Sequence, residues 1–225
     1  DNEVLRQAIS YGINRQQFVD VVLAGAAQPG WTMIAAGWAN NPDLKPISYN
    51  PEMAKQKLAE AGYPNGVTVP MGCPPTGAYF DVCEFTQAML SEVGINLDLE
   101  LVERGGYFRM DDQGYFRNQG MGASRWGHRV DPHQLNQFLW HKDGFKVRGT
   151  YVNEEISALI DRAATVYDLA EARKLYDQIQ LIAASEATVP ALAWATNFQA
   201  MSKDVMNYVP YPTVFEHLEF LWLDR

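Results

Sequence analysis

The sequence predicts a mixed α/β fold in which helices and strands alternate along the chain. Three observations support this prediction. Helix start and stop residues recur along the chain, one segment alternates strictly between apolar and polar residues, and no internal repeat interrupts the pattern. The 225 residues are 47% hydrophobic, which is enough apolar material for a sizeable core.

The first helices are predicted by capping residues that precede amphipathic segments. Asn2 precedes a segment whose apolar residues fall on one face, and Asn14 starts a second helix that Gly25 ends. Asn50-Pro51-Glu52 combines an N-cap, a proline at the first helical position and an acid that favours the helix dipole. Gly62 closes this third helix.

The later helices follow the same rules. We expect them at Phe80–Val93, within Arg104–Gln119, from Asp131-Pro132 to Leu139, at Glu154–Val166 and at Leu169–Ala184. Asn153 and Asp168 are the expected N-caps of the last two.

Strands are expected between these helices. The predicted strands are Val67–Met71, Ile95–Val102, part of Gly120–Trp126 and a segment near Ala191–Thr196. Ile95–Val102 alternates apolar and polar residues, as a half-buried strand does. Pro74–Tyr79 is expected to be a loop, and Gly30–Ser48 a long irregular connection. Trp31 and Trp38 in this connection either reach a binding cleft or cover the core.

Charge and composition exclude some classes of protein. The net charge is −9 and no basic stripe is present, so a nucleic-acid partner is not expected. No apolar run approaches the length that spans a bilayer. Asp1–Arg6 lacks the features of a signal peptide, which is typical of a mature fragment or an excised domain.

The two cysteines, Cys73 and Cys83, leave two alternatives open. They are ten positions apart and no Cys/His cluster accompanies them, which argues against the common zinc sites. A disulfide would tie a loop to the following helix, would require an oxidising compartment and would stabilise the fold by roughly 2–3 kcal/mol. Two free buried thiols are the other alternative.

Several segments resemble one known family. The stretches VLRQAISYGINRQQFVDVVLAGAAQPG (Val4–Gly30) and YNPEMAKQKLAEAGYPNG (Tyr49–Gly66) are similar to motifs of the extracellular solute-binding proteins of family 5. The stretches MLSEVGINLDLELVE, VDPHQLNQFL, YVNEEISALIDRA and VPALAW continue the similarity in the same order. The resemblance therefore covers essentially the whole chain.

The resemblance implies a fold like that of periplasmic binding proteins of type II, in the peptide-binding cluster. Two lobes of such proteins enclose a ligand by closing about a hinge. By this resemblance, residues 1–186 form the second lobe and residues 187–225 return to a first lobe that is mostly absent from this chain. It further implies a non-enzymatic, cofactor-free protein that is periplasmic, or extracellular and membrane-tethered, and that delivers a small solute to an inner-membrane ABC permease.

The resemblance also places candidate ligand residues around Trp126. His128 stands where peptide-binding members carry an aspartate that pairs with the amine of the peptide. A mostly neutral imidazole cannot replace that carboxylate, so an ordinary peptide ligand is not favoured. Trp126 is a candidate for stacking on the ligand and Arg125 for pairing with a ligand carboxylate, as is Arg129. The alternatives are core packing for Trp126 and a solvated loop for the arginines.

Two further hypotheses concern the neighbouring residues. Thr76 and Tyr79 follow a predicted strand end and offer hydroxyl groups to a ligand, although ordinary loop structure also explains them. His128, Asp131 and His133 also suggest a metal-dependent hydrolase. Against this alternative, Asp131 before Pro132 already fits the N-cap of a helix.

Overall fold

The computed structural model describes residues 2–112, 120–127, 129, 131–144, 152–210 and 218–224, with only the backbone for residues 110–112. The elements of the first half are α1 (Glu3–Gly12), α2 (Arg15–Gln17), the π-helix η1 (Phe18–Val22), β1 (Ala27–Pro29), α3 (Pro51–Glu60), β2 (Val67–Cys73), α4 (Gly77–Ser91) and β3 (Ile95–Leu101). Those of the second half are α5 (Arg104–Asp112), β4 (Met121–Gly122), α7 (Pro132–Trp140), α8 (Glu154–Ala163), α9 (Leu169–Ser185), β5 (Ala193–Ala195), β6 (Val205–Met206) and β7 (Trp222–Leu223).

The central sheet has three parallel strands in the order β3-β2-β4. Val67 pairs with Ile95 and Cys73 with Leu101, while Met71 pairs with Met121. Because the strands are parallel, their carboxyl ends meet at one edge of the sheet. Helix α4 connects β2 to β3 and packs against both strands.

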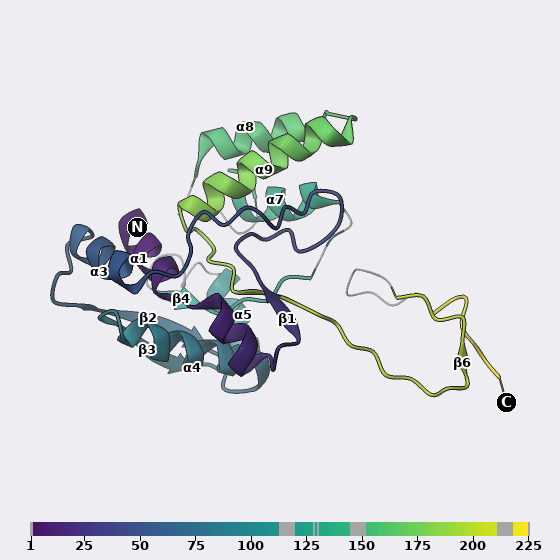
Figure 1. Cartoon of the computed structure of the whole chain (residues 1–225), viewed down its shortest axis with the longest axis horizontal. Helices are drawn as coiled ribbons and strands as arrows, with labels where there is room; N and C mark the ends of the chain where they lie inside the picture. Colours follow the sequence, from purple (N-terminus) through teal and green to yellow (C-terminus); the bar gives the residue numbers. More distant parts are fainter. Residues whose placement is uncertain are drawn as a thin grey trace.

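Two separate hydrophobic clusters form the core. The first joins α1, α3, α4 and the central sheet, and its buried residues are Ala8, Ile9, Ile13, Ala54, Leu58, Met71, Cys73, Cys83, Leu90, Val93, Ile95, Leu97 and Ala123. The second joins α7, α8, α9 and the connection after β1, and its buried residues are Ile34, Ala39, Leu135, Leu139, Trp140, Ile156, Ile160, Ala163, Ala172, Leu175, Tyr176, Ile179 and Ala183. Figure 1 shows the three helices of the second cluster gathered on one side and the sheet on the other.

The predicted capping residues are confirmed. The side chains of Asn2, Asn50 and Asn153 each accept a hydrogen bond from a backbone N–H three residues later. Asp168 accepts two, from Ala170 and Glu171. Each bond satisfies a donor that the first turn of a helix leaves free, so these residues fix where the helices begin.

One local prediction is wrong. The segment Pro74–Tyr79 is not wholly a loop, because α4 begins at Gly77 and includes Tyr79. Thr76 occupies the N-cap position with extended backbone, but its side chain makes no capping bond. The helix predicted after Asn14 is present, but it is α-helical for three residues only and continues as the π-helix Phe18–Val22.

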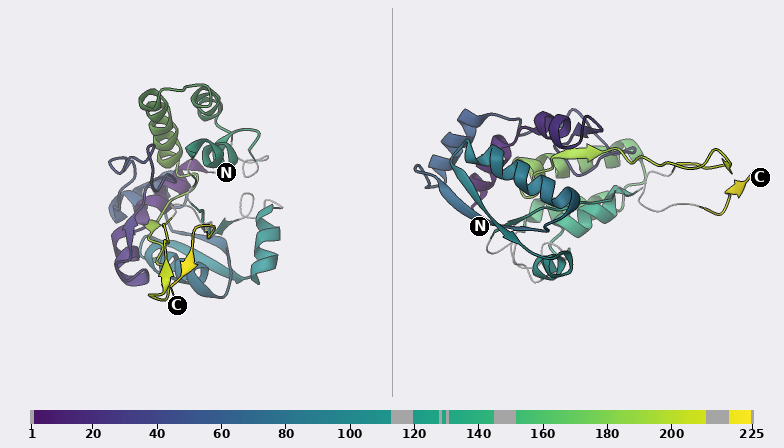
Figure 2. Two further views of the ribbon diagram at one scale, coloured as in Figure 1. Left: turned by 90° about the vertical axis from the view of Figure 1, so that its right-hand side faces the viewer. Right: turned by 90° about the horizontal axis from the view of Figure 1, so that it is seen from below.

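Beyond α9 the chain becomes extended. β5 pairs antiparallel with β1, and β6 pairs antiparallel with β7. The segment that carries β6 projects away from both clusters, as Figure 1 and the right-hand view of Figure 2 show. Several large apolar side chains there are exposed, among them Phe198 (75%), Phe220 (69%) and Trp222 (53%). None of the described helices is long and apolar enough to cross a membrane.

Candidate functional site

The carboxyl edge of the central sheet gathers most of the predicted ligand residues. β2 leads into Thr76 and α4, while β4 leads into Arg125 and Trp126. The connection after β2 runs to β3 on one side, and β4 lies on the other side of β2. The carboxyl ends of β2 and β4 therefore flank a point where the strand order reverses, which is the usual place for a ligand in an open α/β sheet.

An aromatic cluster lies at this edge. The ring centroid of Tyr79 on α4 lies 6.2 Å from that of Tyr107 and 6.4 Å from that of Phe108, both on α5. The Tyr107 hydroxyl donates a hydrogen bond to the carbonyl of Ala123, directly after β4. The cluster thus connects the segments that follow all three strands of the central sheet.

Arg104 lies over this cluster. Its guanidinium carbon is 5.9 Å from the Tyr79 ring centroid and 5.7 Å from that of Phe108, within the range of cation–π attraction. Both Arg104 and Phe108 are exposed. Among the described residues, no carboxylate forms a salt bridge with Arg104.

Trp126 and Arg125 differ in their surroundings. The Trp126 ring lies edge-on to Phe138 of α7, with centroids 5.2 Å apart, and is partly buried against the second cluster. Packing therefore accounts for part of its surface, and the rest is available for contact. Arg125 and Thr76 are exposed. His128 lies outside the described residues.

Cys73 and Cys83 form a disulfide in the structure. Both side chains are fully buried. The bond connects the last residue of β2 to the second turn of α4, and so closes the short loop that contains Thr76. This cross-link restricts the loop at the carboxyl edge of the sheet.

Of the residues of the hydrolase alternative, Asp131 has a local structural role. The Asp131 carboxylate accepts a hydrogen bond from the His133 backbone N–H at 2.8 Å and caps α7. Among the described residues, no group of three or more His, Cys, Asp or Glu side chains is placed to hold a metal ion.

A second concave surface lies beside the β1–β5 pair. Its volume is about 260 Å³, and Trp31, Trp194 and Lys45 contribute to its wall. The Lys45 ammonium lies 4.9 Å from the Trp31 ring centroid. Trp38, in contrast, packs on Tyr176 within the second cluster, with ring centroids 5.6 Å apart. The two tryptophans of this connection therefore have different roles, since Trp31 lines a groove and Trp38 covers the core.

Sequence reasoning did not identify Arg104, Tyr107 and Phe108 as site residues. They follow a strand that the alternation of Ile95–Val102 predicts well, and their position directly after its carboxyl end was the available signal. What the sequence lacked was the strand order, which brings the end of β3 close to the ends of β2 and β4.

A comparison with known families identifies a matching family. The family described as "Bacterial extracellular solute-binding proteins, family 5 Middle" matches residues 1–146. This range contains α1 to α7, and with them the whole central sheet and the candidate site.

Individual relatives agree with this match. The chain is 28% identical to heme-binding protein A of Haemophilus influenzae, over 94% of this chain and 40% of the relative. It is 26% identical to the dipeptide-binding protein of Escherichia coli, over 97% of this chain and 42% of the relative. The solved structure of HbpA2 from Haemophilus parasuis matches with a TM-score of 0.83 and 24% identity, over 100% of this chain and 45% of that structure. The chain thus spans less than half the length of these relatives.

Proposed function

Because the chain belongs to family 5 of the bacterial extracellular solute-binding proteins, we propose that it supplies one lobe of a protein that captures a small organic solute for an ABC importer. The observation that carries this proposal is the family match over residues 1–146. The solute would be held between two lobes in the periplasm, or outside the cell on a tethered protein, and handed to a permease in the inner membrane. The chain does no covalent chemistry in this proposal, so affinity comes from buried surface and a few polar contacts.

We assign the chain to two lobes on the basis of the same family membership. Residues 1–186 form the second lobe, and residues 187–225 return to the first lobe, which the rest of the protein supplies. The exposed apolar side chains of the extended segment support this division, because a surface with Phe198, Phe220 and Trp222 uncovered is typical of one that another part of a protein covers.

The ligand surface that we propose is the carboxyl edge of the central sheet. Tyr79 and Phe108 offer aromatic contact, while Arg104 and Arg125 offer paired N–H donors to an anionic group. Trp126, Thr76 and His128 complete the candidate set. His128 in place of an amine-pairing carboxylate disfavours a peptide bound by its free amine. The favoured solute is therefore an organic anion with a flat or apolar part.

The test uses the intact protein that contains this chain. Native mass spectrometry of the purified protein identifies any solute that it retains, and thermal-shift measurements compare heme, dipeptides and small dicarboxylic acids. We expect a carboxylate-bearing solute to raise the unfolding midpoint. The proposal is wrong if no solute is retained and none of these compounds, nor any from a wider metabolite panel, changes the midpoint.

Substitutions then locate the site. Arg104→Gln and Arg125→Gln should each weaken binding of the identified solute about tenfold or more, because each removes a charge-assisted hydrogen bond. Arg173→Gln is the matched control, since Arg173 is an exposed arginine on α9 that donates to the carbonyl of Asn40. Equal affinities for all three variants would exclude the carboxyl edge as the ligand surface.

A further inference from the structure

Arg15 is a buried cation that, in the part of the chain that the structure describes, is bound only by neutral oxygen atoms. Its side chain is 4% exposed and follows α1 at the start of α2. The Nε–H group donates to the carbonyls of Gly30 (3.2 Å) and Ala191 (2.8 Å). The Nη1 group donates to the carbonyls of Ser10 (3.2 Å) and Ile47 (3.4 Å), and Nη2 donates to the Ser10 hydroxyl (2.9 Å).

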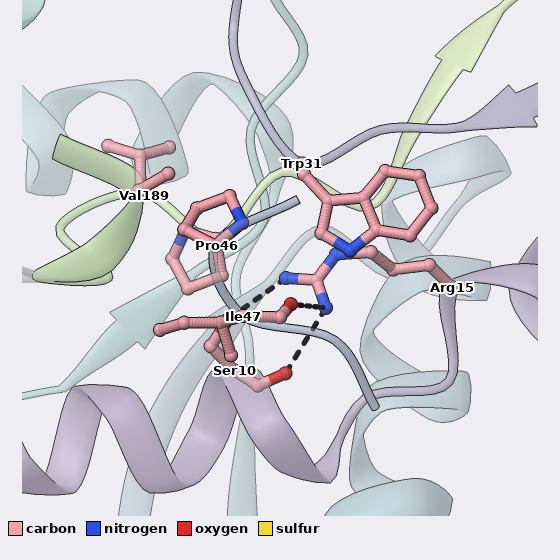
Figure 3. A pocket seen from close by; sticks show the side chains of 8 residues that line it. Ser10, Arg15, Trp31, Pro46, Ile47 and Val189 are labelled. Carbon is pink, nitrogen blue, oxygen red and sulfur yellow. Dashed lines mark hydrogen bonds between the residues drawn. The ribbon is translucent and has the colours of Figure 1, made fainter. Parts of the chain in front are cut away.

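The surroundings of the guanidinium are densely packed. Figure 3 shows it beside the Trp31 ring, with Ser10 and Ile47 within hydrogen-bonding reach. The described residues around it leave no cavity large enough for a water molecule. Burial lowers the pKa of Arg15 to about 10, so the side chain remains charged at neutral pH. Among the described residues, these hydrogen bonds are what offsets the desolvation of the guanidinium.

The carbonyl groups of Gly30, Ile47 and Ala191 occupy similar places along the path of the chain. Each lies where the chain passes between the two hydrophobic clusters. The chain leaves the first cluster near Gly30, contributes Ile34 and Ala39 to the second, and returns near Ile47. It leaves the second cluster after α9 and reaches the first near Ala191, since the next residue, Leu192, packs against the first cluster.

The candidate ligand surface is divided between the same two clusters. Tyr79 packs against the first cluster, and Ala123, to which the Tyr107 hydroxyl donates, is part of it. Trp126, only three residues later, packs against the second. The distance between the aromatic cluster and Trp126 therefore depends on how the two hydrophobic clusters are held relative to each other.

We propose that Arg15 is a positioning residue that joins the two clusters and so sets the spacing of the two halves of the ligand surface. The effect on ligand binding rests on the proposed function. The link that Arg15 makes between the two clusters does not. An arginine suits this role because its planar fork reaches several carbonyls in fixed directions. A lysine would carry the charge but offers one nitrogen at a single point, so it cannot bridge all these segments.

Hydrogen exchange on the intact, ligand-free protein tests whether Arg15 links the two clusters, and this test does not require a solute. The variant is Arg15→Met, and the reporters are backbone amides in and beside the segments that pass between the two clusters, which we call the junction amides. These are Gly30 N–H to Leu192, Asn50 N–H to Tyr11 and Thr196 N–H to Ala26. We expect these amides to exchange roughly ten- to a hundredfold faster, while the amides of β2 and β3 and those of α8 and α9 keep their protection.

Control variants distinguish a local link between the two clusters from a general contribution of Arg15 to the stability of the fold. Arg173→Met removes an exposed arginine bond within the second cluster and should leave the junction amides unchanged. Arg15→Lys should increase exchange at the same amides, and it replaces Arg15→Met if that variant does not fold. Faster exchange by a similar factor throughout both clusters, or no change at the junction, would overturn the proposal. Absence of a bound solute would contradict the proposed function and leave this result unaffected.

Discussion

Glu186 follows the C-terminus of α9 in a partly buried, acidic environment. Its carboxylate accepts a hydrogen bond from the Asn153 side chain at 2.9 Å. Burial, together with the nearby charge of Glu3, raises the pKa of Glu186 above its usual value, and Arg6 only partly opposes this shift. The folded protein therefore holds a proton on Glu186 at a pH where the unfolded chain has lost it.

This shift predicts a pH dependence of stability. Because the pKa of Glu186 is higher in the folded state, its contribution favours folding at acidic pH and is lost as pH rises from the unfolded pKa through the folded one. Glu186→Gln retains an acceptor for Asn153 but cannot ionise. We expect this variant to unfold at a higher temperature than the wild type at pH 7, with the difference disappearing near pH 4. Calorimetry across this range is the measurement, and a difference independent of pH would show that ionisation of Glu186 is not its cause.

At the residue scale, the role of a side chain could be predicted from sequence where it hydrogen-bonds to the backbone of residues close to it in the chain. Asn50 and Asp168 could be identified as N-caps because their partners lie two or three residues away. Arg15 and Arg104 could not be identified in this way. The partners of Arg15 extend to Ala191, and Tyr79, one partner of Arg104, lies on a different helix. Interactions over such separations depend on topology, which local patterns do not encode.

At the scale of elements, two glycines allow the turns that precede β2 and β3 to approach closely at the amino edge of the sheet. Gly66 precedes β2 with a φ of +97°, and Gly94 precedes β3 with a φ of +86°. A Cβ atom at Gly66 would lie 2.8 Å from the carbonyl oxygen of Gly94. The same carbonyl accepts a hydrogen bond from the Val67 N–H, so it cannot easily move away.

Gly66→Ala should therefore be more destabilising than an alanine at an open left-handed position. Gly25, with a φ of +77° and no atom within 4 Å of an added Cβ, provides that comparison. We expect Gly25→Ala to lower the free energy of unfolding by about 1–2 kcal/mol from the backbone conformation alone. Gly66→Ala should cost at least about 1 kcal/mol more because of the added clash. Urea denaturation measures both, and equal costs would show that the turn relaxes freely.

The prediction of elements succeeded where a pattern was long and failed where pairing was remote. The alternation of Ile95–Val102 and the capped helices after Asn153 and Asp168 matched the structure. β1 was missed because three residues that end in a proline carry no periodic signal. It exists because β5, far along the chain, pairs with it.

At the scale of the whole molecule, the chain consists of two clusters and an extended segment. The mixed α/β class followed from the order of elements, and the resemblance to family 5 supplied the expected architecture. The division of the core into two clusters was not predicted. Helix periodicity shows that a face is buried, but it does not show which helices share a core. The helices that were predicted from capping and periodicity therefore could not be assigned to either cluster from sequence.

The extended segment provides a test of the proposed division into lobes. Trp222 is 53% exposed in this chain, and Leu223 beside it is 50% exposed. If residues 187–225 pack on a first lobe in the intact protein, Trp222 becomes buried there. The difference in fluorescence emission between wild type and Trp222→Phe isolates this one residue among six tryptophans. We expect its emission to be red-shifted and readily quenched by acrylamide in the isolated chain. In the intact protein it should be blue-shifted and protected, and equal quenching in both would contradict the return of this segment to a first lobe.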